Sequence, residues 1–212
     1  LNKIKDNYKA PDGTDYTGKT ISRTQTVNIA ASTVKVEASK DVVVRGNPFS
    51  VTITGQPNTY YVIWAKGTGQ MTGLALDQPP MLVESQKDIT SNAAIGMYQY
   101  EGGAGYDLVD DVPVNPSAYR YFAAAKTSNS GTITVGWVTS QETKDKKYTF
   151  RVERGPGANA ITDATWRDRL YADAYKSDEV DVKVEKGTVT VVAAGDASYF
   201  LGQEVKLTFH ES

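Results

Sequence analysis

Short segments in which apolar and polar residues alternate run through this chain, and this period of two constrains its fold most. Side chains of a β-strand point to opposite faces in turn, so each alternating segment predicts a strand with one buried face. Residues 60–65 are more continuously apolar, which predicts a central strand. The other predicted strands are residues 33–38, 49–54, 121–126, 132–138, 147–153, 180–185, 188–192 and 204–209. The 23 Thr and 22 Val residues favour the same structure, because β-branched side chains suit a pleated surface.

Two connections stand out between these predicted strands. Ser128-Asn129-Ser130-Gly131 is rich in turn-forming residues and predicts a hairpin that joins the strands on either side of it. Residues 162–175 predict the single short helix, because Trp166, Leu170 and Ala174 recur every four residues. Thr162 or Asp163 can cap its first turn.

An internal repeat appears when the chain is shifted by 155 positions. Residues 26–36 then align with residues 181–191, and the apolar positions stay in phase. After a one-residue gap the match continues through Gly46 with Gly202, and through Phe49, Val51 and Ile53 with Val205, Leu207 and Phe209. Chance agreement between alternating strands is the alternative, and the Gly and Asp residues shared at the turns argue against it.

The repeat divides the chain into one whole module and parts of two others. Residues 1–32 are the end of a preceding module or a linking strand, residues 33–187 form a complete module, and residues 188–212 begin a following one. The chain starts with Leu1 rather than Met, so we expect it to be part of a longer protein. A hairpin alone is marginally stable and exposes strand edges, so neighbouring modules or another chain should complete both ends. One hypothesis is that residues 188–209 of one subunit complete the sheet left open by residues 1–32 of another.

The middle module has the features of an immunoglobulin-like sandwich without its disulfide. Trp64 follows Ile53 by 11 residues on the third strand, which is the place of the core Trp. Tyr148 precedes Phe150 by two residues, as the Tyr of a tyrosine corner precedes the second Cys. Phe150 would then replace that Cys, with Ile53 or Val51 in place of the first. The predicted fold is an all-β, immunoglobulin-like sandwich with a long insertion at residues 67–131 and one short helix, in tandem modules.

Several segments resemble repeat domains of large cell-surface proteins in methanogenic archaea, which include S-layer and other envelope components. They are Arg45-Gly46-Asn47-Pro48-Phe49-Ser50-Val51-Thr52-Ile53-Thr54-Gly55, Tyr61-Val62-Ile63-Trp64, Asp77-Gln78-Pro79-Pro80, residues 127–149 and Ser177-Asp178-Glu179-Val180. The resemblance covers roughly residues 33–210. It implies a secreted, structural, multi-domain protein without catalytic residues.

The composition argues against most catalytic functions and against strongly charged partners. With 23 Lys and Arg against 25 Asp and Glu, a net charge of -2 does not suit a nucleic acid or an anionic membrane as main ligand. There is no Cys and one His, His210, which argues against thiolate sites, His-based triads and multi-His metal sites. No run of 18 apolar residues is present to span a membrane. We expect no enzyme, no cofactor, and no catalytic or metal-binding residues.

Acidic residues gather in two places. Asp107, Asp110 and Asp111 lie in the predicted insertion, where a solvated acidic loop is the first interpretation. A calcium site is the second, although the spacing of an EF-hand loop is missing, and a pair of glycosidase carboxylates is the third. Asp12 and Asp15 predict a turn, with calcium binding again as the alternative.

Other candidates are aromatic, glycine-rich or basic. The insertion contains Tyr98, Tyr100, Tyr106, Tyr119 and Tyr121, whose rings can pack internally, contact a subunit or stack on sugars. Residues 101–105 form a flexible Gly-rich loop without the context of a dinucleotide site. Lys144, Lys146 and Lys147 suggest a solvated hairpin edge that deters edge pairing.

These observations predict a structural protein of the cell exterior or envelope, whose immunoglobulin-like modules assemble into a surface layer or filament. The expected partners are identical subunits or neighbouring modules, with glycans as further candidates and no nucleic acid. No N-x-Ser/Thr acceptor is available, so a glycan on this chain would be O-linked. A carbohydrate-binding or adhesion module that uses the Tyr-rich insertion is the alternative function, and a secreted hydrolase that uses the Asp cluster is the third.

Overall fold

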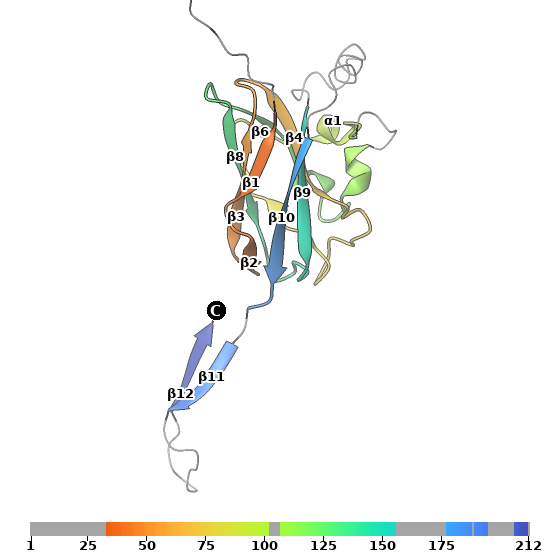
Figure 1. Cartoon of the computed structure of the whole chain (residues 1–212). Coiled ribbons are helices and arrows are strands. Elements are labelled where there is room, and N and C mark those ends of the chain that lie inside the picture. Colours follow the sequence, from red (N-terminus) through yellow and green to blue (C-terminus); the bar gives the residue numbers. More distant parts are fainter. Residues whose placement is uncertain (1–32, 102–106, 156–176, 188, 195–205, 212) are drawn as a thin grey trace, which may run out of the picture. The chain divides into compact units, whose positions relative to one another are not determined.

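Two β-sheets make up most of the described part of the chain (Figure 1). The computed structural model describes residues 33–101, 107–155, 177–187, 189–194 and 206–211. The first sheet has the order β1-β3-β8-β5, formed by β1 (Lys35–Ala38), β3 (Pro48–Thr54), β8 (Thr132–Val138) and β5 (Met81–Leu82). The second has the order β2-β10-β9-β4-β7-β6, formed by β2 (Val42–Val44), β10 (Ser177–Glu185), β9 (Lys147–Arg154), β4 (Tyr60–Lys66), β7 (Phe122–Lys126) and β6 (Ile89–Thr90).

Within each sheet, the strands lie side by side in the order of an immunoglobulin-like sandwich. Immunoglobulin domains place strands A, B, E and D in one sheet and strands C, F and G in the other, and variable-type domains add two strands beside C. Here β7 and β6 take the two added places beside β4, and β2 pairs in parallel with β10. The predicted all-β sandwich is therefore confirmed. The short strands β2, β5 and β6 were not predicted.

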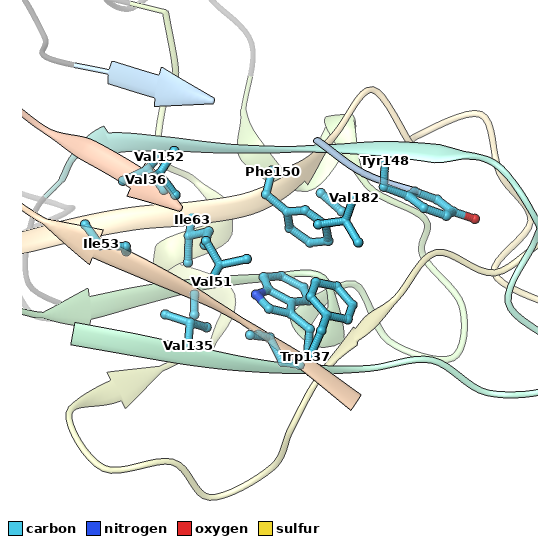
Figure 2. Packing of buried hydrophobic residues seen from close by; sticks show 14 of the residues in the cluster. Val36, Val51, Ile53, Ile63, Val135, Trp137, Tyr148, Phe150, Val152 and Val182 are labelled. Carbon is cyan, nitrogen blue, oxygen red and sulfur yellow. The ribbon is translucent and has the colours of Figure 1, made fainter. Parts of the chain in front are cut away.

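The space between the sheets is filled by alternate residues of the strands on both sides (Figure 2). Figure 2 labels Val51, Ile53, Val135 and Trp137 from the first sheet and Ile63, Phe150, Val152 and Val182 from the second. Phe150 takes the predicted place of the second Cys, with its ring centroid 4.6 Å from that of Trp137 and 5.5 Å from that of Phe49. Aromatic packing thus occupies the position that a disulfide fills in antibody domains.

Trp64 is fully buried, but the prediction that it fills the centre of the sandwich is wrong. Ile63 and Ala65 belong to the cluster between the sheets, so Trp64 lies on the opposite face of β4. There it joins a second apolar cluster, and the Trp between the sheets is Trp137. β4 is apolar on both faces, so its sequence does not distinguish the inner face from the outer one.

The predicted insertion at residues 67–131 is partly sheet and partly a cover over the outer face of β4 and β7. It contributes β5, β6 and β7 to the two sheets. The cover contains helix α1 (Ala93–Gly96) and the 3₁₀ turns η1 (Leu108–Asp111) and η2 (Ala118–Arg120). α1 was not predicted, and the predicted helix at residues 162–175 lies outside the described residues.

The turn at residues 128–131 exists, but the hairpin predicted around it does not. β7 pairs with β4 and β6, whereas β8 pairs with β3 and β5 in the other sheet. Gly131 has a φ of 81°, and a Cβ there would lie 2.4 Å from the oxygen of Gly55. The turn therefore needs glycine to carry the chain from one sheet to the other.

A separate two-stranded sheet consists of β11 (Val189–Ala194) and β12 (Lys206–Glu211). Its antiparallel register pairs Thr190 with His210, Val191 with Phe209, Val192 with Thr208 and Ala193 with Leu207. The register of β1 with β3 pairs Lys35 with Thr54, Val36 with Ile53, Glu37 with Thr52 and Ala38 with Val51. Adding 155 to each β1 number and 156 to each β3 number gives the pairs of β11 with β12. The two pairs of strands thus share their register, at the offset found in the sequence repeat.

The predicted tyrosine corner is confirmed. Tyr148 is buried, and its hydroxyl donates a hydrogen bond of 2.8 Å to the carbonyl oxygen of Lys144, four residues upstream. The same hydroxyl lies 3.3 Å from the carbonyl oxygen of Gln78. Burial raises the pKa of Tyr148, so the hydroxyl stays protonated and remains a donor.

We expect Tyr148→Phe to lower the free energy of unfolding by about 1–2 kcal/mol, because it removes the donor to the part-buried carbonyl of Lys144. Urea denaturation of both proteins measures the difference. Tyr60→Phe is the matched control, because the Tyr60 side chain is partly exposed on the same sheet. Equal stabilities of Tyr148→Phe and the parent chain would contradict a stabilising corner.

Candidate functional site

Three of the segments that carry the resemblance to cell-surface repeats, those with Arg45, Asp77 and Lys144, meet at one end of the sandwich, where β9 begins and β10 ends. Arg45 Nη2 lies 2.9 Å from Asp145 Oδ1, and Lys144 Nζ lies 2.8 Å from Asp77 Oδ1. Gln78 forms a parallel bridge with Thr143. Residues that are far apart in the sequence therefore build one polar network, which we call the end network.

Gln78 is the buried centre of the end network. Its side-chain carbonyl accepts a hydrogen bond of 2.9 Å from Ser140 Oγ, and its amide donates one of 3.2 Å to the oxygen of Gly73. Its backbone N–H donates to Glu142 O, and its carbonyl accepts from Lys144 N. Gln78 thus fastens the first loop of the insertion to the loop before β9, much as a strand residue would.

Asp77 holds the same loop through its carboxylate. Lys144 binds one oxygen, while the backbone N–H of Thr72 donates to the other at 2.8 Å and the Thr72 hydroxyl at 3.0 Å. The hydrogen bond from Lys144 and those from Thr72 lower the pKa of Asp77 to about 2. The ionised carboxylate is therefore part of the folded loop.

We expect Asp77→Asn to destabilise the protein at neutral pH and the difference to disappear in acid. A carboxyl whose folded pKa is depressed stabilises the fold above its unfolded pKa, and this contribution is lost as pH falls through the folded value. The window runs from the ordinary value of 3.8 down to about 2. Denaturation midpoints across this range measure the effect, with Asp110→Asn on the exposed surface as control. A difference that does not change with pH would contradict this role.

The end network also holds the chain where it leaves the sandwich. The N–H of Arg45 donates to Glu185 O and the N–H of Val184 to Lys146 O, both at 2.9 Å. Lys186 Nζ lies 3.7 Å from Asp145 Oδ2. A hydrogen bond from its own backbone N–H, with Lys186 and Arg45 nearby, lowers the pKa of Asp145. The sandwich therefore holds the chain up to residue 186, and β11 begins at residue 189.

β9, beside β4, carries a buried acidic group that the sequence did not reveal. Glu153 is fully buried and accepts hydrogen bonds from Arg151 Nε at 2.7 Å, Tyr98 Oη at 2.9 Å and the N–H of Glu101 at 3.2 Å. Arg151 Nη1 in turn lies 2.7 Å from Glu179 Oε1. Glu153 occupies a polar position of an alternating strand, which predicts exposure, and only the covering insertion buries it. The bonds from Tyr98 and Glu101 tie the insertion to the sheet.

The three acidic residues of the insertion have different surroundings. Asp111 Oδ2 accepts hydrogen bonds from Trp64 Nε1 at 2.7 Å and from the N–H of Gly67 at 3.0 Å. Asp107 precedes η1, and Asp110 is exposed. Within the described ranges no three His, Cys, Asp or Glu side chains are grouped so that they could hold a metal ion. Asp12 and Asp15 lie outside those ranges.

Most described Tyr residues of the insertion have packing roles. Tyr98 is buried against Glu153, and Tyr121 is buried with its hydroxyl 2.6 Å from the oxygen of Asn115. Burial raises the pKa of Tyr121 to about 12. The ring of Tyr100 lies 5.4 Å from that of Trp64. These contacts favour the packing interpretation over sugar stacking.

Among the described Tyr residues of the insertion, Tyr119 is the exposed one, with 43% of its surface accessible. Tyr106 and the Gly-rich residues 102–105 lie outside the described residues. Other large apolar side chains of the insertion are also exposed, namely Leu74, Leu76, Val83, Met97 and Val114. The insertion thus contributes an apolar surface as well as a cover.

The basic run has different roles from the predicted one. Lys144 pairs with Asp77, Lys146 Nζ lies 5.5 Å from the ring centre of Tyr148, and Lys147 pairs with Asp181 on the neighbouring strand β10. β9 lies between β10 and β4, so this run does not protect a sheet edge and that prediction is wrong. His210 lies in β12.

Comparison with known proteins yields distant structural likeness only. No protein-family model matches the chain, and no curated protein matches it. Among solved structures, the bacterial hydrophobin BslA is 9% identical over 73% of this chain and 100% of its own, with a TM-score of 0.29. The fimbrial chaperone CfaA is 9% identical over 84% of this chain and 67% of its own, with a TM-score of 0.29. AvmM, which catalyses a macrocyclization, is 12% identical over 80% and 94%, with a TM-score of 0.34. Likeness this weak does not indicate a function.

Within the described residues, no helix has the length and apolar character needed to cross a membrane.

Proposed function

We propose that this chain is part of a non-enzymatic structural protein of the cell exterior, built from tandem immunoglobulin-like modules that assemble into a layer or filament. The proposal places it beside the surface repeat proteins of methanogenic archaea that its sequence resembles. Its partners are neighbouring modules and identical subunits.

The observation that carries this proposal is the shared register of β11–β12 and β1–β3. A chance likeness between two alternating strands would not fix which residues pair across them, because antiparallel strands can slide in register by two residues and keep their faces. Four pairs of β11–β12 lie at the offset that the sequence repeat predicts. We therefore assign β11 and β12 as the first and third strands of a further module.

The anchored end of the sandwich supports the same proposal. Because Glu185 and Lys186 are held by the end network, residues 187 and 188 are the connection between the last strand of the sandwich and β11. So short a connection limits the freedom between successive modules. An array linked in this way suits a load-bearing surface structure better than loosely tethered domains do.

The hydrogen bonds of the half-buried Asp111 and the buried Glu153 support a non-catalytic role. Asp111 binds Trp64 and Gly67, and Glu153 binds Arg151, Tyr98 and Glu101. Each fastens the insertion to the sheet. The proposal therefore assigns these groups to the fold rather than to a reaction.

Immunogold labelling of intact cells of the source organism, with an antibody against this chain, tests the proposal. We expect label on the outer surface, and ordered layers or filaments in electron micrographs of the parent protein. Label confined to the cell interior would overturn the proposal. A glycan array separates the adhesion alternative, which requires binding that Tyr119→Ala abolishes.

A further inference from the structure

β12 has one backbone edge bonded to β11, and within the described residues no strand pairs with its other edge. An unpaired edge presents N–H and C=O groups to any strand that fits them. The sandwich contains a complete version of the same arrangement. There β3 lies between β1 and β8. Because β12 corresponds to β3, β8 shows which kind of strand fits the open edge of β12.

Hydrogen bonds show which neighbouring strand the N–H and C=O groups of each β3 residue face. The oxygen of Ser50 accepts from Ser39 N on the β1 side, and the N–H of Gly55 donates to Gly131 O on the β8 side, both at 2.8 Å. Backbone groups alternate along a strand, so Val51 and Ile53 also face β8. Through the shared register Val51, Ile53 and Gly55 correspond to Leu207, Phe209 and Glu211 of β12.

The residues that oppose each other in β3 and β8 show which side-chain pattern fits. Ile133, Val135 and Trp137 of β8 stand opposite Ile53, Val51 and Phe49. Five of them are buried in the cluster between the sheets, and Ile133 packs against it. The sequence has Phe209, Leu207 and Val205 at the three aligned positions, which are again large and apolar.

We propose that the open edge of β12 is a β-augmentation site for an extended strand with the β8 pattern, added antiparallel in the register of β3 with β8. The occupant is the strand of a further module that corresponds to β8. It is not β8 of an intact second copy, because β8 is already paired on both edges, with β3 and β5. The inference deepens the proposed tandem arrangement and depends on the assignment of β11 and β12 made there.

The test appends a copy of residues 131–139 to the full chain after Ser212, through a Gly/Ser turn of about four residues. Amide hydrogen exchange followed by NMR is the measurement. We expect exchange at Leu207, Phe209 and Glu211 to slow by on the order of tenfold or more, because their N–H groups gain acceptors. Exchange at Thr208 and His210 should change little, since these groups face β11.

The matched control is the same extension with polar residues at the opposing positions of the copy, Ile133→Ser, Val135→Asp and Trp137→Ser. We expect it to leave exchange in β12 unchanged. Equal protection by both extensions, or no protection by either, would overturn the proposal. Protection at Thr208 and His210 in place of their neighbours would do the same, because β12 would then have the opposite orientation to β3.

A second copy of the chain is tested in the same experiment. Slow exchange at Leu207 and Phe209 in the unextended chain, together with a dimer in analytical ultracentrifugation, would make that copy the occupant and reject a β8-type strand. None of these readouts depends on where the parent protein is located. An interior location in the immunogold experiment would therefore remove the cell-surface function and leave the edge site standing.

Discussion

Trp137→Ala is expected to lower the free energy of unfolding by about 3–5 kcal/mol, the range for deleting a large aromatic side chain from a packed core. Trp137 is fully buried between the sheets and packs against Phe150. No disulfide joins the sheets, since the chain has no Cys, so this aromatic packing is a main contact between them. Urea denaturation monitored by circular dichroism measures the change.

The two buried Trp residues provide a control for this prediction. Trp137 Nε1 is buried without a hydrogen-bond partner among the described residues, so Trp137→Phe removes ring area but no bond. Trp64→Phe removes the hydrogen bond to Asp111 and leaves that carboxylate with Gly67 N as its remaining donor. We expect Trp137→Ala to cost far more than Trp137→Phe. A Trp137→Ala protein within about 1 kcal/mol of the parent would contradict a central role for this residue in the core.

The strands that could be predicted are those whose alternation is local. β3, β8 and β9 alternate because one face of each meets the other sheet, and that pattern lies within single short segments. The sheet to which a strand belongs is a non-local property. The turn at 128–131 is compatible with a hairpin and with a crossing between sheets, and only the pairing of β7 with β4 decides between them.

In the candidate site, too, the features that could be predicted are those set by a local sequence pattern. Tyr148 could be identified because the tyrosine corner has a fixed local spacing to Phe150. The bonds that join Asp77 to Lys144 and Arg45 to Asp145 span 67 and 100 positions, so no local pattern reveals them. Glu153 is hidden for another reason. Its place in the strand is polar, and it is buried by a cover that lies outside the two sheets and is distant in sequence.

Arg151→Met is the second substitution with a large expected effect. We expect it to lower the free energy of unfolding by about 3–5 kcal/mol, because it leaves a buried carboxylate without its cation. Glu153 is fully buried, and its bond from Arg151 is 2.7 Å long. Burial opposes the charge of Arg151, but hydrogen bonds to Glu179 and Glu153 outweigh that cost and raise the pKa of Arg151. Arg151 therefore stays charged, and its removal exposes the full cost of burying Glu153.

A double-mutant cycle separates this charge effect from lost packing. In Arg151→Met with Glu153→Gln, the buried charge is gone while a side-chain oxygen remains to accept from Tyr98 and the N–H of Glu101. We expect the double variant to regain at least half of the stability lost by Arg151→Met alone. Lys147→Met, on the same strand, removes an exposed partner of Asp181 and should cost less than about 1 kcal/mol. If Glu153→Gln did not rescue Arg151→Met, the stabilisation by Arg151 would lie in its packing and its bond to Glu179, and the buried pair would not be what holds the insertion on the sheet.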